Sequence, residues 1–200
     1  YQALANSNGT ENTAVGTQSL LSNTTGLRNS AFGYLSLAAN TTASDNTAIG
    51  RTTLRLNTTG SSNTALGYGA LFTNSNGNNN AALGHTALQF NTTGSNNVAV
   101  GFQSLNSNTT ASHNTAVGYQ ALHSQTNPEQ PNTAVGWGAG FDITTGIYNN
   151  LFGSYSGWNI TTGTRNAVCG HFGLSSLTVG SQNTSLGHSA GSSLTTGSNN

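Results

Sequence analysis

Histidine is the side chain in this sequence best suited to bind a transition metal, and two histidines are spaced so that they could act together. His171 and His188 are separated by exactly one period of a repeat that runs through the chain. His85 falls in the same column of that repeat but has no histidine neighbour there. Stacked imidazoles could hold a metal ion, but the column tolerates many residue types. We therefore expect an exposed column and no metal.

Acidic side chains are too few and too dispersed for paired acid–base catalysis. They are Glu11, Asp45, Glu129 and Asp142, each near a turn of a different repeat. Cys169 stands in an apolar column and is expected to be a small hydrophobic residue rather than a nucleophile. No lysine is present to complete a phosphate-binding loop. The sequence therefore predicts that the chain is not an enzyme and carries no cofactor.

Charge is scarce along the whole chain. Only 4% of the 200 residues are charged, against roughly 25% in typical globular proteins. The arginines never cluster, which argues against a nucleic-acid-binding surface. No apolar run approaches the roughly 20 residues needed to span a bilayer, and a single cysteine excludes an intrachain disulfide framework. We expect neither nucleic acid nor membrane insertion.

A 17-residue repeat organises the chain. When the asparagine of the motif Asn-Thr-Ala-Val-Gly is counted as position 0, it recurs once in every repeat, and the interval is constant except for a single step that is one residue longer. We call each such unit a rung. A partial rung covers residues 1–11 and eleven rungs cover residues 12–199, with a one-residue insertion near 128–131. The sequence thus predicts a single repeat array over residues 1–200.

The pattern within each rung predicts short β-strands. Positions 1 to 5 alternate Thr, Ala, Val, Gly and often an aromatic residue, which is the period of two that a strand shows. A second short strand is expected near positions 12 to 14, where Thr-Thr-Gly recurs. The unit is too short for helical-hairpin repeats, and Thr, Asn and Gly weaken helices. We therefore predict an all-β fold, a β-solenoid or β-roll of stacked 17-residue rungs.

Stacked rungs would place identical side chains about 4.8 Å above one another. Asparagine over asparagine makes an amide ladder that satisfies polar groups without charge, and threonine at position 12 should form a hydroxyl ladder. The structural ladder is expected at position 0, in Asn12, Asn29, Asn46, Asn63, Asn80, Asn97, Asn114, Asn132, Asn149, Asn166 and Asn183.

Three columns are expected to fill the interior. Position 3 is apolar in every rung, from Val15 to Leu186, and is predicted to be buried throughout. Position 8 is leucine up to Leu122. Where glycine replaces that leucine, as at Gly157, position 11 changes from Asn or Gln to an apolar residue such as Ile160. This exchange predicts one interior pocket that position 8 or position 11 can fill. Leu174 with Leu177 is the exception, a rung with both.

Small residues at positions 2 and 4 suggest that other chains share the core. Position 4 is glycine in all eleven rungs, and position 2 is alanine in most of them. Such columns let a neighbouring backbone approach closely, and one chain offers each rung few large apolar residues. A homotrimer is the expected state, with a lone, tightly packed solenoid as the alternative. For this reason Gly101→Val is expected to disrupt the assembly.

The runs Asn-Thr-Ala-Val-Gly-Tyr-Gln-Ala-Leu (114–122) and Ser-Leu-Thr-Thr-Gly-Ser-Asn-Asn (193–200) resemble shaft repeats of phage-type tail fibres and related bacterial adhesive fibres. They are also similar to the head repeats of trimeric autotransporter adhesins, although this rung is longer than the usual adhesin-head repeat. The resemblance covers essentially the whole chain. It implies a homotrimeric β-roll, often joined to a receptor-binding tip or a C-terminal chaperone domain.

The functional hypothesis is mechanical: a structural, extracellular fibre shaft that spaces a binding tip from a virion or cell surface. Cell-surface glycans or a receptor would be partners of that tip, outside this segment. The alternative is an adhesin that binds glycans along the shaft. Its candidate contacts at position 5 are Tyr34, Tyr68, Phe102, Tyr119 and Trp137. An ice-binding solenoid is less favoured, because adjacent threonines at positions 12 and 13 point to opposite faces of a strand.

Asn-x-Ser/Thr sequons recur along the chain, and the Asn-Thr-Thr pattern produces them by composition alone. N-glycans would require secretion through a pathway that adds them. The sequons begin at Asn8, Asn23, Asn40, Asn57, Asn91, Asn108, Asn159 and Asn183.

Overall fold

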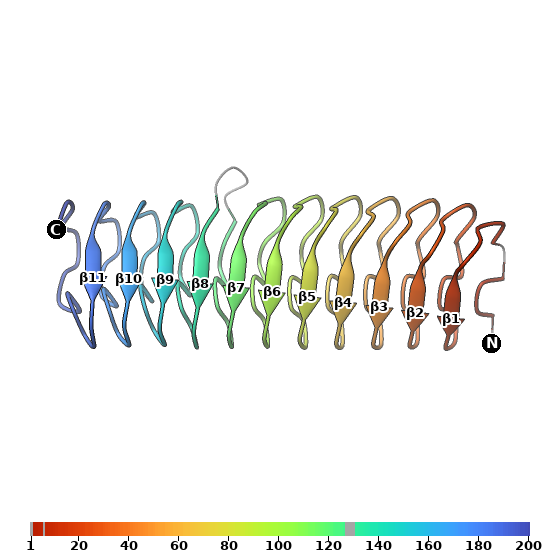
Figure 1. Cartoon of the computed structure of the whole chain (residues 1–200), viewed down its shortest axis with the longest axis horizontal. Helices are drawn as coiled ribbons and strands as arrows, with labels where there is room; N and C mark the ends of the chain where they lie inside the picture. Colours follow the sequence, from red (N-terminus) through yellow and green to blue (C-terminus); the bar gives the residue numbers. More distant parts are fainter. Residues whose placement is uncertain (1, 6, 127–130) are drawn as a thin grey trace.

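The chain forms a straight β-solenoid (Figure 1). In the computed structural model, which describes residues 2–5, 7–126 and 131–200, eleven short strands form one parallel sheet. The strands follow one another in chain order from β1 to β11. Figure 1 shows them side by side along the long axis, with the two termini at opposite ends of the rod. Consecutive repeats in the sequence are therefore neighbours in space.

Each strand is three residues long and occupies positions 1 to 3 of its rung. The strands are β1 (Thr13–Val15), β2 (Ser30–Phe32), β3 (Thr47–Ile49), β4 (Thr64–Leu66), β5 (Ala81–Leu83), β6 (Val98–Val100), β7 (Thr115–Val117), β8 (Thr133–Val135), β9 (Asn150–Phe152), β10 (Ala167–Cys169) and β11 (Thr184–Leu186). Equivalent positions pair throughout, as Ala99 does with Ala116. The predicted all-β solenoid, with one rung for each asparagine-to-asparagine step, is confirmed.

The sheet keeps its register across the one longer step of the repeat. Thr115 of β7 pairs with Thr133 of β8, so equivalent positions still face each other there. The carbonyl of Pro131 accepts a hydrogen bond from the backbone N–H of Tyr148 at 2.9 Å. The rest of the expected insertion, with Pro128 and Glu129, lies outside the described residues.

Position 2, rather than position 3, faces the interior, so the predicted burial of position 3 is wrong. Val15 is 55% exposed and Leu66 is 46% exposed, whereas Ala65 and Ala99 are fully buried. A period of two fixes which residues share a face of a strand, but not which face lies inside. The interior next to the strand is filled by the leucine of position 8, as at Leu105. Because the leucine fills this space, only a small residue such as alanine fits at position 2.

The leucine reaches the interior from left-handed backbone. Leu37 and Leu105 both have φ of 49°, a conformation that costs a residue with a Cβ roughly 1–2 kcal/mol. Burial of a leucine side chain contributes about 1.5–3 kcal/mol and offsets that strain. Where this position is glycine, as at Gly157 with φ of 57°, the same turn is adopted without the steric penalty.

Positions 8 and 11 share one interior pocket, as predicted. Leu105 at position 8 and Ile160 at position 11 are both fully buried. A Cβ added to Gly157 would lie 2.8 Å from Ile160 Cδ1 and 3.0 Å from Leu151 Cδ2. Ile160 therefore occupies the space beside position 8 when leucine is absent. Leu151 at position 2 also fills this space, a compensation that the sequence pattern did not predict.

The small columns at positions 2 and 4 are explained within one chain. Alanine at position 2 lines the chain's own core. Glycine at position 4 has positive φ, such as +129° at Gly101, and a Cβ there would overlap the carbonyl oxygen of Gly118 in the next rung. The inference from these columns to a neighbouring chain is therefore wrong, because the packing within one chain accounts for glycine at position 4 and for alanine at position 2 wherever leucine fills position 8.

The second strand expected near positions 12 to 14 does not form in the described residues, where the backbone bends instead. The threonine column at position 12 is held by bonds to the backbone instead of by a hydroxyl ladder. Thr92 Oγ1, for example, donates to the carbonyl of Thr109 in the next rung at 3.0 Å. Thr24 Oγ1 donates to the carbonyl of Thr41 at the same distance.

Candidate functional site

Asparagine at position 0 builds a hydrogen-bonded ladder along the interior. Asn46 donates to Asn29 Oδ1 twice, from its backbone N–H at 3.1 Å and from Nδ2 at 3.2 Å. The same Nδ2 donates to the carbonyl of Gly60 at 2.9 Å. The bond from the backbone to the preceding side chain repeats at every step from Asn12 to Asn183. Amides such as Asn46 therefore close their own rung and join it to the next, whereas Asn114 Nδ2 donates to the carbonyl of Ser112.

A second amide ladder runs at position 11 and was not predicted from the sequence. Asn40 Nδ2 donates to Asn23 Oδ1 at 2.8 Å and to the carbonyl of Ala43 at 3.0 Å. The ladder continues to Asn108 and is followed by Gln125, which accepts a bond from Asn132 Nδ2 at 3.0 Å instead. The repeated asparagine at position 11 could have predicted this ladder, because a second column of asparagines can stack and hydrogen-bond in the same way as the column at position 0.

Most of the sequons lie in these two ladders. Their asparagines are buried and hydrogen-bonded at Asn23, Asn40, Asn57, Asn91, Asn108 and Asn183. Glycosylation of such a side chain would require the rung to open. Asn8 is exposed and Asn159 is half-buried, so these two sequons are more accessible.

The aromatic residues at position 5 form a stacked column on the surface. Ring centroids lie 5.0 Å apart between Tyr68 and His85, 5.4 Å between His85 and Phe102, and 5.2 Å between Phe102 and Tyr119. The column reaches Trp137, 5.1 Å from Tyr119, and the Trp137 ring in turn stacks on Trp158 with centroids 5.8 Å apart. At the other end, the Arg51 guanidinium lies 5.6 Å from the Tyr34 and Tyr68 ring centroids. The five predicted contact residues are exposed, but their neighbours cover ring faces from Tyr68 to Tyr119.

The outer face of the sheet carries a continuous apolar column at position 3, beside the aromatic column. Its members are Val15, Phe32, Ile49, Leu66, Leu83, Val100, Val117, Val135, Phe152, Cys169 and Leu186. We call this surface the strand face. Toward the C-terminal end it is hollowed by a cavity of about 250 Å³ lined in part by Phe152, Cys169 and Leu186. Cys169 is therefore exposed and not, as predicted, buried.

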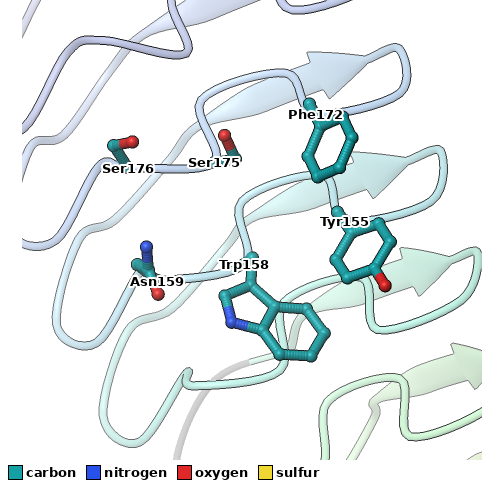
Figure 2. A pocket seen from close by; sticks show the side chains of 6 residues that line it. All are labelled: Tyr155, Trp158, Asn159, Phe172, Ser175 and Ser176. Atoms are coloured by element: carbon teal, nitrogen blue, oxygen red, sulfur yellow. The ribbon is translucent and has the colours of Figure 1, made fainter.

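A groove of about 370 Å³ opens on another side of the C-terminal rungs, at positions 6, 9 and 10 (Figure 2). Three aromatic side chains, Tyr155, Trp158 and Phe172, line one part of it. Three small polar side chains line the remainder: Asn159, Ser175 and Ser176. None of the lining residues carries a charge. Aromatic rings and small polar side chains meet in this groove.

Among the described residues, the titratable side chains form pairs at most and do not gather into one site. His171 and His188 are neighbours, with ring centroids 5.3 Å apart and planes tilted by 50°. Within the described ranges, no three His, Cys, Asp or Glu side chains form a cluster that could hold a metal ion. Asp45 is ion-paired with Arg28 at 2.6 Å, and this partner lowers the pKa of Asp45. Burial raises the pKa of Asp142.

Comparison with known protein families, curated proteins and solved structures found no match for the chain. Across the described part of the chain, no helix has the length and apolar character needed to cross a membrane. The function is therefore inferred from the geometry of the rungs and their surfaces.

Proposed function

We propose that this chain is a segment of the shaft of an extracellular fibre, a stiff spacer that holds a binding tip away from a virion or cell surface. The observation that carries the proposal is the uniform register of the array, in which each strand pairs in parallel with the next from β1 to β11. Rungs joined in the same way along the whole rod resist bending equally at every step. A spacer needs this property more than any local chemistry.

The interior supports the same role. Two amide ladders and a leucine column fix each rung to its neighbours. The hydrogen bonds of these ladders join neutral groups, so salt does not screen them as it screens ion pairs between exposed charges. A rod held together in this way keeps its stiffness over a wide range of ionic strength, which suits a surface exposed to the environment.

The strand face supports association of three copies. Single exposed apolar residues are ordinary, but a contiguous apolar stripe marks an interaction surface. Position 3 is apolar in every rung although it is exposed or half-buried. Three chains that turn their strand faces toward a common axis would cover Val100, Val117 and the equivalent residues. We base the homotrimer on this column and not on the small residues at positions 2 and 4.

Mass photometry of the purified chain tests the assembly, and electron microscopy tests the rod. We expect a mass of three 20.3-kDa chains and straight particles. Replacing Val100 and Val117 together by Asp should give single chains that keep the β-sheet circular dichroism of the parent, because both side chains point outward. Thr93→Asp with Thr110→Asp, in two adjacent rungs of the exposed column at position 13, is the matched control and should stay trimeric. A parent that runs as a single chain contradicts the trimer, and flexible particles contradict the spacer.

The two alternative functions receive less support. Glycan binding along position 5 would need free ring faces, but Phe102 and Tyr119 are stacked in a continuous column. Ice binding would need free threonine hydroxyls, but at position 12 the hydroxyls, such as that of Thr92, donate to backbone carbonyls. A spacer predicts that substitutions at position 5 leave binding of any ligand unchanged, and thermal hysteresis would reveal ice binding.

A further inference from the structure

A short stack of rings at position 9 ends abruptly at Trp158. The rings of His123 and Phe141 stack with centroids 5.0 Å apart, and those of Phe141 and Trp158 stack with centroids 4.5 Å apart and planes within 5°. In the next rung this position is Ser175. The side chain of Ser175 is too small to cover an indole, so the face of Trp158 that points away from Phe141 has no ring upon it.

The uncovered indole face borders the groove. Figure 2 shows Trp158 beneath Ser175 and Ser176, with Tyr155 and Phe172 to one side and Asn159 to the other. Tyr155 and Phe172 stack on each other at 4.8 Å, so they form a wall. Trp158 supplies the ring face and lies 5.0 Å from Tyr155 between centroids. The groove thus lies beside Trp158, at the place where the column stops.

The polar side chains around the groove are not used by the fold. Asn159, Ser175 and Ser176 are half-buried, and their side chains make no hydrogen bond to any other described residue. The asparagines within the two ladders, such as Asn29 and Asn23, by contrast use their side chains in joining rungs. One amide and two hydroxyls therefore remain able to donate and accept hydrogen bonds at the rim of an aromatic platform.

We propose that this groove binds a neutral saccharide, one ring of which stacks on the free face of Trp158. A pyranose presents C–H groups on a flat face and hydroxyls around its edge, which matches an aromatic surface with a rim of small polar groups. The sugar ring would continue the position 9 column in the place where Ser175 leaves it empty. Hydroxyls at the edge would bond to Asn159, Ser175 and Ser176.

The charge and geometry of the groove disfavour other flat or cationic ligands. A nucleotide would need cationic partners for its phosphates, whereas no charged residue lines the groove. Arg165, in the same part of the rod, lies over the Tyr148 ring at 5.5 Å, outside the groove lining. A quaternary ammonium would need several ring faces around it, but Tyr155 and Phe172 are stacked on each other.

The site is separate from the proposed trimer surface. The groove is built from positions 6, 9 and 10, whereas the strand face is built from position 3. Saccharide binding goes beyond the spacer role and does not depend on it. Loss of binding without loss of the rod would affect only this proposal, and loss of the trimer would leave the groove intact.

Tryptophan fluorescence and ligand-observed NMR with the purified full chain test the proposal. The probes are glucose, galactose, mannose, N-acetylglucosamine and N-acetylgalactosamine, with their disaccharides, each up to about 10 mM, which detects Kd values in the millimolar range. Trp137→Phe leaves Trp158 as the only tryptophan reporter. Because the Trp137 ring stacks on Trp158 with centroids 5.8 Å apart, ligand-observed NMR with the parent chain serves as the control for this variant. We expect at least one probe to bind and to change the emission of Trp158. No binding by any probe would overturn the proposal.

Two variants separate the groove from the fold. Trp158→Ala should weaken binding at least about tenfold, but it also removes a stacking partner of Phe141. Ser175→Phe is the sharper test, because a ring there would extend the column, fill the groove and keep the rung folded. It should abolish binding while the melting temperature stays at or above that of the parent. If Ser175→Phe binds the probe as tightly as the parent does, the sugar does not lie on Trp158 and the proposal is wrong.

Discussion

The rings of Tyr119 and Trp137 lie parallel within 4°, with centroids 5.1 Å apart, although the one-residue insertion separates them in the sequence. Asn132 explains how this register is kept. Its backbone N–H donates to Asn114 Oδ1 at 2.9 Å, as at every other step of the ladder. The insertion is therefore absorbed before position 0 of the next rung, and the strands and the position 0 ladder after it keep their register.

Asn63→Ala should destabilise the rod at its centre. Asn63 Oδ1 accepts bonds from the backbone N–H and Nδ2 of Asn80, and Asn63 Nδ2 donates to the carbonyl of Gly77. The substitution leaves these buried groups without partners, and each such group costs about 1–3 kcal/mol. Thermal unfolding followed by circular dichroism measures the loss. Thr59→Ala, on the exposed turn, is the control and should melt like the parent.

Gly101→Val should be more destabilising than Phe102→Val, but for a reason that lies within one chain. At Gly101, φ is +129° and a Cβ would overlap the Gly118 carbonyl. Overpacking costs about 1–3 kcal/mol, and the left-handed strain adds to it. Phe102→Val removes only ring stacking on each side, about 0.5–1.5 kcal/mol per pair. Equal melting temperatures for the two variants would show that position 4 is not tightly packed.

The length of the rung and its register could be read from the sequence, because the strict columns leave only one way to align the repeats. The pocket shared by positions 8 and 11 could be read in the same way. Apart from the rung of Leu174 and Leu177, a large apolar residue stands at position 8 or at position 11 but not at both, and such an exchange indicates a shared volume. These features depend on residue size and spacing, which the sequence states explicitly.

The inner face of the strand could not be read in that way. The small Ala14 and the apolar Val15 alternate along the strand, and the pattern alone allows either side chain to face the interior. The choice depends on backbone outside the strand, where left-handed residues at positions 6 and 8 turn leucine inward. Leucine is not a residue in which positive φ is expected. The groove was not predicted either, because its aromatic and polar residues occur together in only two rungs and do not recur along the repeat.

Gly157→Leu should be strongly destabilising alone and much less so in a compensated background. Its Cβ would meet Ile160 Cδ1 at 2.8 Å and Leu151 Cδ2 at 3.0 Å, and overpacking of this kind costs about 1–3 kcal/mol. Adding Leu151→Ala and Ile160→Ala opens the space that leucine occupies in the N-terminal rungs. Urea unfolding of all combinations gives the coupling free energy. If the effects simply add, the residues do not share one pocket.

His123 should make the stability of the rod depend on pH. Burial lowers the pKa of His123 below its usual value of 6.5, against the opposing effect of Asp142. Its Nδ1 is buried without a hydrogen-bond partner in the described chain, and its ring stacks on Phe141. The folded chain therefore binds this proton more weakly than the unfolded chain does. The stability contributed by neutral His123 is present above about pH 6.5 and is lost as the pH falls through that value toward the lower folded pKa.

His123→Phe isolates this effect, because a phenyl ring keeps the stack on Phe141 and cannot be protonated. The melting temperature of the parent should fall, relative to that of the variant, as the pH is lowered from about 7.5 to about 5.5. Asp142 is present in both proteins. Burial raises the pKa of its carboxyl, so its own contribution is lost as the pH rises above its usual value of 3.8. A constant difference between the two melting curves across this range would mean that His123 is as easily protonated in the folded rod as in the unfolded chain.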